Sequence, residues 1–294
     1  MEGRLPEDLE RYIFELVALS RPVAIPTLIL VARRVKNWIE PLLYRVIVLD
    51  SYPPIDGLPF FASDVLYDIL RKKPKPLLEH CVKHLIVTSR TGGGSSSQLR
   101  SMLLLACTGI TDLAIQSEVP LATHELFAIA KFTALRYLAV HLQHLFRVIH
   151  LDFTHPVFRH LTHLEVRDMG GLPDTIWEHI IDIPNLTHLA FRDVNLCPIF
   201  GHALDSCPRL ECLVFLCQLR EDILLAGKLV DDPRFVALKM GGYPALPDSQ
   251  RDWQRNAIGD SYWASADRFV AAKKAGEINT HRYRIDIDDG AWGP

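Results

Sequence analysis

The chain has 294 residues, of which 49% are hydrophobic and 23% charged, a composition typical of folded globular proteins and unlike that of disordered or fibrous ones. Its formal net charge of −3 at pH 7 lacks the basic excess that general binding to nucleic acids or acidic membranes requires. Six scattered cysteines do not make a disulfide scaffold, and no apolar run is long enough for a signal peptide or a spanning helix, so we expect an intracellular protein of the cytoplasm, the nucleus or both.

The first fifty residues predict a small helical unit. Apolar residues at i, i+4, i+7 and i+8 follow Pro6 and indicate one face of a helix: Leu9, Ile13, Leu16 and Val17. A second helix is predicted after Pro26 by apolar residues at i, i+3, i+7 and i+10: Leu28, Val31, Val35 and Trp38. A strand-like segment follows at residues 45–49. Because residues 1–50 can bury little surface alone, we expect them to dock on the structure that follows.

A pattern of one apolar residue, two variable residues, Leu, one variable residue and a second apolar residue then recurs seven times. The copies begin at Val82, Ile110, Leu135, Leu161, Leu186, Leu210 and Phe235. Successive copies start 24 to 28 residues apart, which is the period of leucine-rich repeats. The Leu and the final apolar residue are two positions apart, so on a strand both point into a shared core. Residues 51–245 therefore predict an α/β leucine-rich-repeat solenoid of about seven strand–helix units, with a parallel sheet on its concave face.

The residues beside each central Leu point the opposite way, towards the concave face of such a solenoid. At its centre they predict a partner-binding surface made of Tyr137, His141, His163, Glu165, Arg167, His188 and Arg192. Arginine and tyrosine are favoured anchors of protein interfaces, and the partly cationic surface suits an acidic or phosphorylated segment of a protein substrate. The alternative is a solvated face on which each arginine is satisfied by its neighbour, Asp168 or Asp193.

Residues 246–294 are rich in aromatic side chains and predict a cap over the last repeat. Its helix is expected to begin after an N-cap at Asp260 and to end at Gly276, and a terminal strand is expected over residues 283–287.

We find no pattern of catalytic or metal-binding residues in the sequence. The histidines and cysteines lack the spacing of a structural zinc site. Gly259-Asp260-Ser261 resembles the nucleophile block of one esterase family, but no Asp-x-x-His follows it. We therefore predict a non-catalytic protein without a metal or cofactor.

The N-terminal residues resemble an F-box, the motif by which adaptor proteins join a ubiquitin ligase. The matching segments are Leu5-Pro6-Glu7-Asp8-Leu9, Leu30-Val31-Ala32-Arg33-Arg34, Trp38 and Pro41-Leu42-Leu43-Tyr44-Arg45. With degenerate repeats after it, the whole chain is similar to the F-box/leucine-rich-repeat proteins of basidiomycete fungi.

This resemblance implies a substrate-recognition subunit of an SCF-type cullin-RING ubiquitin ligase. The F-box would dock on the Skp adaptor, and the repeats would hold an unidentified protein substrate. The residues that would contact the adaptor are Leu5, Pro6, Leu9, Ile13, Leu30 and Val31. Outside that complex the protein is expected to be a monomer.

The alternative is a non-catalytic leucine-rich-repeat binding or scaffold protein without ligase association. The two hypotheses differ in where the side chains of Leu5, Pro6, Leu9 and Ile13 lie. The ligase hypothesis expects them to be exposed, because an exposed apolar patch indicates a partner. The alternative expects them to be packed against residues 28–38.

Overall fold

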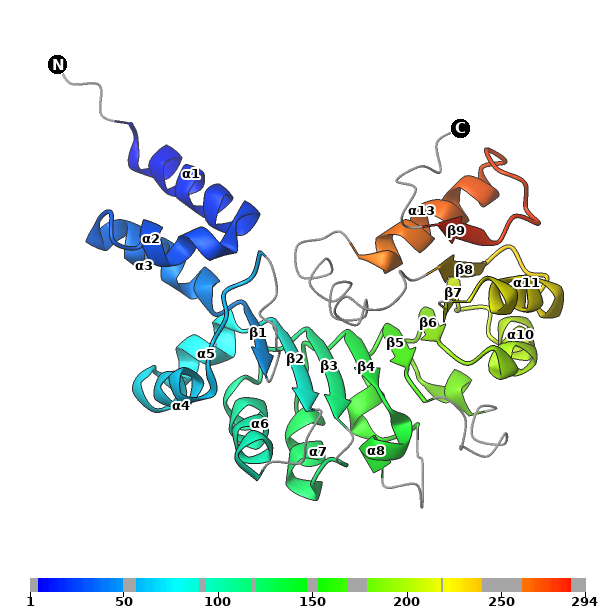
Figure 1. Cartoon of the computed structure of the whole chain (residues 1–294), viewed down its shortest axis with the longest axis horizontal. Helices are drawn as coiled ribbons and strands as arrows, with labels where there is room; N and C mark the ends of the chain where they lie inside the picture. Colours follow the sequence, from blue (N-terminus) through cyan, green and yellow to red (C-terminus); the bar gives the residue numbers. More distant parts are fainter. Residues whose placement is uncertain are drawn as a thin grey trace.

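The computed structural model describes residues 5–49, 57–89, 94–117, 120–146, 153–168, 179–217, 219–239 and 261–286. Within these residues the chain is an α/β protein built on one open sheet of nine parallel strands. The strands lie side by side in chain order, and the sheet curves into an arc (Figure 1). They are β1 (Val46–Leu49), β2 (His84–Ser89), β3 (Asp112–Ser117), β4 (Tyr137–Val140), β5 (His163–Val166), β6 (His188–Phe191), β7 (Cys212–Cys217), β8 (Phe235–Lys239) and β9 (Arg284–Asp286).

Most of the helices lie on the outer side of this arc, where each connects two neighbouring strands (Figure 1). They are α4 (Ser63–Lys72), α5 (Lys75–Cys81), α6 (Gly94–Ala106), α7 (Thr123–Ile129), α8 (Leu142–Phe146), α10 (Cys197–Ser206) and α11 (Arg220–Leu229). Short 3-10 turns complete three of the connections: Pro156–Phe158, Ile180–Asp182 and Val194–Leu196. The main hydrophobic core lies between the sheet and these helices.

The central leucines of the sequence pattern explain how this core is built. From β2 to β7 they pair in register with one another, so that they form one continuous row along the sheet. The members of the row are Leu85, Leu113, Leu138, Leu164, Leu189 and Leu213, and all are buried. Ile47 on β1 extends the row by pairing with Leu85, so the strand-like segment before the repeats belongs to the same array.

The seventh copy of the pattern departs from this row. Phe235, not Leu238, pairs with Leu213, and Leu238 pairs with Leu216. Successive side chains of a strand point to opposite faces of the sheet. A shift by three residues, an odd number, therefore places Leu238 on the inner face. Phe235 takes the place of a central leucine in the outer core. The expected alignment of this copy is therefore wrong by three positions.

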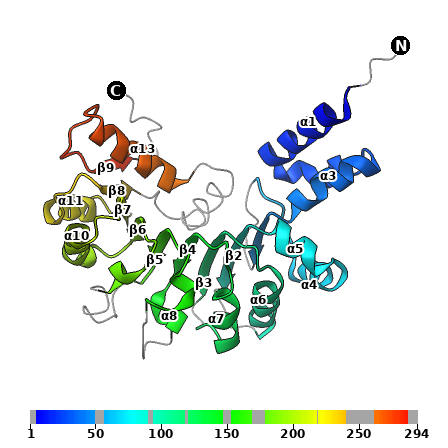
Figure 2. The same cartoon turned by 180° about the vertical axis from the view of Figure 1, so that it is seen from behind.

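At the N-terminal end of the arc, three helices form a separate bundle (Figures 1 and 2). They are α1 (Glu7–Ser20), α2 (Ile25–Leu28) and α3 (Arg33–Leu43), with a 3-10 turn at Pro22–Ala24 between the first two. Pro22 is the first residue of its 3-10 turn and Pro26 is the second residue of α2, positions where a missing N–H costs nothing.

At the C-terminal end, α13 (Tyr262–Lys274) lies on the inner side of the arc and β9 pairs with β8 (Figure 2). The apolar side of α13 packs on inner-face residues of β6, β7 and β8, including Ala190, Val214 and Leu238. The helix thus covers the concave face, whereas the sequence predicted a cap over the last repeat. Its N-cap is Ser261, which accepts a hydrogen bond from the Ala264 N–H, whereas Asp260 lies outside the described residues.

Candidate functional site

The N-terminal bundle has a small core of its own. Ala18, Ile25, Val35 and Ile39 are buried in it, and Phe14 packs against them. α1 is described over its whole length and buries one residue, Ala18. Ala18, Phe14 and Glu10 are four residues apart, so they lie on one side of α1, and this is the side that faces α3.

The opposite side of α1 is apolar and exposed. It carries exposed apolar residues at helical spacing, from Leu5 just before the helix to Leu16 in its third turn: Leu5, Leu9, Tyr12, Ile13 and Leu16. Leu9 retains 52% of its surface, although helices of this kind usually turn such residues into a core. We call these five residues the outward face of α1. No contact within the described residues buries it.

The six predicted adaptor-contact residues are all exposed. Leu5, Pro6, Leu9 and Ile13 lie at the start and on the outward side of α1, and Leu30 and Val31 lie in the turn between α2 and α3. Leu30 retains 82% of its surface. Tyr12 and Leu16 also belong to this surface, although neither was among the predicted contact residues. Leu16 was already part of the predicted apolar periodicity, and Tyr12 lies three residues after Leu9, so helical spacing alone could have identified both.

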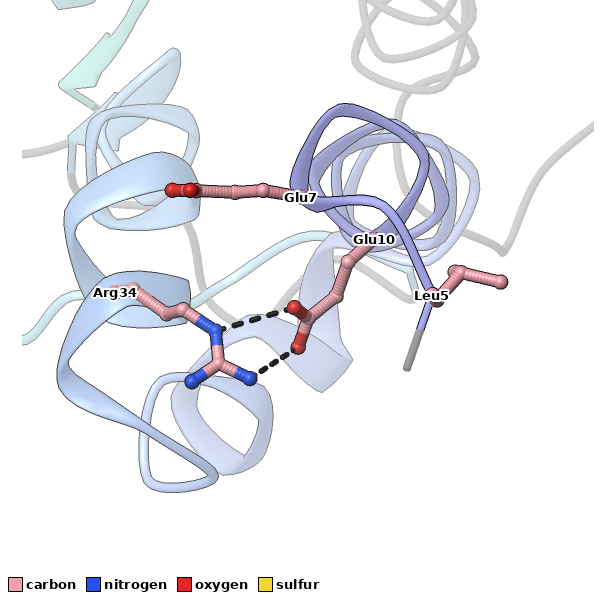
Figure 3. Close-up of a pocket in the computed structure, with 4 residues that line it drawn as sticks. All are labelled: Leu5, Glu7, Glu10 and Arg34. Carbon is pink, nitrogen blue, oxygen red and sulfur yellow. Dashed lines mark hydrogen bonds and ion pairs between the residues drawn. The ribbon is translucent and has the colours of Figure 1, made fainter. Parts of the chain in front are cut away.

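A pocket of about 380 Å³ lies where the N-terminal turns of α1 and α3 meet, and it is lined by Leu5, Glu7, Glu10 and Arg34 (Figure 3). Arg34 donates two hydrogen bonds to the Glu10 carboxylate, from Nε at 3.1 Å and from Nη2 at 2.7 Å. This bidentate geometry is the strongest that an exposed arginine–carboxylate pair adopts. In Figure 3 Leu5 points away from the ion pair.

The concave face carries a row of rings that the strand register brings together. Tyr137, His163 and His188 occupy equivalent positions on β4, β5 and β6. Ring centroids are 4.1 Å apart between Tyr137 and His163, and 4.0 Å apart between His163 and His188. Trp263 of α13 stands edge-on against both histidines. The predicted column of side chains therefore exists, and α13 covers part of it.

Burial sets the charge state of two histidines of the concave face, His163 and His141. His188 contacts the Asp267 carboxylate of α13 through Nε2 at 2.8 Å. Burial lowers the pKa of His163 to about 2, so its imidazole is neutral at physiological pH. Burial also lowers the pKa of His141 to about 4, with a smaller contribution from Arg167. Two of the three predicted histidines therefore add no positive charge to the surface.

The arginines of the concave face are bound to Glu165. Its carboxylate, with 1% of the residue exposed, lies 3.1 Å from Arg167 and 2.9 Å from Arg192. Tyr262 of α13 donates a further hydrogen bond to it at 3.2 Å.

The neighbouring aspartates have other roles. Asp168 accepts hydrogen bonds from the Leu142 and Gln143 N–H groups at the start of α8. Asp193 accepts a hydrogen bond from the Asn195 N–H group. The alternative that Asp168 and Asp193 satisfy the two arginines is therefore wrong.

The predicted partner-binding residues thus divide into two groups. Glu165, Arg167 and His188 are buried within the chain itself. Tyr137, His141, His163 and Arg192 keep part of their surface. The structure brings all seven to the concave side of β4, β5 and β6 and the residues that follow these strands.

Other kinds of site receive no support from the described residues. Across them, no group of three histidine, cysteine or acidic side chains could hold a metal ion. All six cysteines are free, and burial raises the pKa of Cys107 and Cys197 to about 12, which keeps both as thiols. In the part of the chain that the structure describes, no helix is long and apolar enough to cross a membrane.

Comparison with models of protein families and with curated proteins finds no match for this chain.

Proposed function

We propose that this chain is the substrate-recognition subunit of an SCF-type ubiquitin ligase. In this proposal the N-terminal bundle is an F-box that docks on a Skp-type adaptor. The arc of strands and helices is a leucine-rich-repeat solenoid that holds a protein substrate.

The outward face of α1 is the observation that carries the proposal. Monomeric proteins rarely expose contiguous apolar surface along a whole helix, because each buried square ångström contributes about 25 cal/mol. Here the helix packs on α3 with one side and presents leucine, isoleucine and tyrosine on the other. Such a helix is suited to pack against apolar helices of a partner. Leu30 and Val31 add apolar surface from the turn between α2 and α3.

The position of this face also favours docking on an adaptor. The bundle stands at one end of the arc, whereas α13 covers the concave face near the other end (Figure 1). A protein bound to α1 would therefore leave the repeats accessible to a second partner. Tyr137, His141, His163 and Arg192, which keep part of their surface, are the residues that we propose for substrate contact.

The proposal is tested by co-expressing the chain with the Skp-type adaptor of its own organism, followed by size-exclusion chromatography. We expect a 1:1 complex that the double substitution Leu5→Asp/Leu9→Asp abolishes. A folded wild-type protein that elutes apart from the adaptor would leave the alternative, a repeat protein that binds partners without a ligase.

A further inference from the structure

The outward face of α1 and the turn that carries Leu30 and Val31 belong to different elements. They can act as one surface only if α1 keeps a fixed orientation on α3. Ala18, near the C-terminal end of α1, is buried in the bundle core together with partly buried Phe14. Glu10, one residue after Leu9, forms the ion pair with Arg34.

The two anchors of α1 are therefore well separated. Ala18 follows Glu10 by eight positions, or about 12 Å along the helix. Arg34 is the second residue of α3 and follows Val31 by only three positions. The ion pair thus joins the part of α1 that carries Leu5 and Leu9 to the part of the bundle that carries Leu30 and Val31.

We propose that the Glu10–Arg34 ion pair is a positioning pair, which holds α1 and the α2–α3 turn as one docking surface. This inference rests on the proposed function for the identity of the partner. The orientation of α1 itself can be measured without any partner.

The pair is exposed, with 51% of the Arg34 side chain and 24% of the Glu10 side chain accessible. Exposed ion pairs contribute little to folding stability. Loss of the pair should therefore leave the protein folded and let the N-terminal half of α1 swing about its anchor at Ala18. Binding of the partner would then have to fix the orientation of α1, and the free energy spent on this ordering would lower the affinity.

The chain offers a matched control on the same helix. Arg11 pairs with Glu15 at 2.8 Å, but both residues lie on α1, so this ion pair cannot orient α1 relative to α3. Arg34→Gln and Arg11→Gln each remove one positive charge and one exposed ion pair. The charge exchange Glu10→Arg/Arg34→Glu restores the interhelical pair with opposite polarity.

The first measurement uses the free protein. Spin labels are attached to cysteines introduced at Asp8 on α1 and Lys75 on α5, in a Cys81→Ser background that leaves only the five buried native cysteines. We expect the label–label distance distribution to broaden in Arg34→Gln, to stay narrow in Arg11→Gln and to narrow again in the charge exchange. A distribution that is unchanged in Arg34→Gln would overturn the positioning role.

The second measurement is the affinity for the Skp-type adaptor. We expect Arg34→Gln to weaken binding by about threefold to tenfold, Arg11→Gln to have no effect and the charge exchange to recover most of the loss. Equal losses in the two single variants would also overturn the inference. If the wild-type protein does not bind the adaptor, the proposed function fails, and the distance measurement still decides whether the pair orients α1.

Discussion

The Tyr262 hydroxyl donates a hydrogen bond to the Glu165 carboxylate at 3.2 Å, although the two residues are 97 positions apart in the chain. This bond joins the C-terminal helix α13 to the middle of the sheet. Glu165 also holds Arg167 and Arg192, so α13 closes over a charged cluster that the concave face would otherwise expose. Part of the concave face is therefore buried beneath α13 and forms a second core.

Substitution of Glu165 by Gln should destabilise the fold strongly. The variant keeps the shape of the side chain but leaves Arg167 buried without its carboxylate, and removing one partner of a buried ion pair costs about 3 kcal/mol or more. Urea unfolding measures the change. Tyr262→Phe serves as the comparison, because it loses one hydrogen bond, worth about 1 kcal/mol. Equal effects of the two variants would show that Glu165 does not organise the cluster.

Protonation of His163 should link stability to acid pH. Its pKa is about 2 in the folded chain and about 6.5 in the unfolded chain. Above pH 6.5 neither state binds the proton, so the contribution to stability is fully present. Below that pH only the unfolded state binds it, so stability falls as the pH falls towards 2. His163→Phe keeps a ring in the stack and should reduce this loss by up to about 1.4 kcal/mol per pH unit.

The free energy of unfolding, measured in urea at pH 7.5, 6.0 and 5.0, checks the pH prediction. A wild-type dependence that persists in His163→Phe would contradict the prediction.

A methyl group at Gly227 should weaken the attachment of the C-terminal segment. A Cβ atom there would overlap the ring of Tyr283, which precedes β9 and packs on the outer core. Gly227→Ala is therefore expected to lower thermal stability, at a cost of about 1–3 kcal/mol. Gly201→Ala is the matched control, because Gly201 is also helical and its added methyl would have no neighbour nearer than 3.9 Å.

In the double variant Gly227→Ala/Tyr283→Ala the overlap no longer exists. Its destabilisation should therefore be smaller than the sum of the two single effects. Additive effects would mean that Tyr283 and Gly227 do not contact each other.

The sequence predicted the strands well, and the reason lies in the leucine row. Leu85 and its five successors recur at the period of one strand–helix unit and point into one core, so each copy signals both a strand and the side that it buries. The prediction failed at β8, where Phe235 and Leu238 are both apolar and only the pairing with Leu213 decides between them. The spacing of apolar residues within β8 does not show which of them pairs with Leu213 on β7.

The concave face was predicted in part. Strand alternation correctly brought Tyr137, His163 and His188 into one row. It could not reveal that α13 covers that row, because Trp263 and Asp267 are far from β5 and β6 in the sequence. The periodicity of a helix shows which of its sides is apolar, but not which part of the sheet that side covers. Likewise, the periodicity of α1 identified an apolar side, whereas its exposure depends on α3 packing against the opposite side.

The affinity of the purified chain for the Skp-type adaptor decides whether α1 is a docking helix. Titration calorimetry would compare the wild type with Leu9→Asp/Ile13→Asp on the outward face of α1. Leu224→Asp/Leu225→Asp on α11 is the control, because those two leucines are also about half exposed. We predict that the wild type and the α11 variant bind equally well and that the α1 variant does not bind. Adaptor binding that survives the α1 substitutions, or an absence of binding by the folded wild type, would rule out docking of the adaptor on α1.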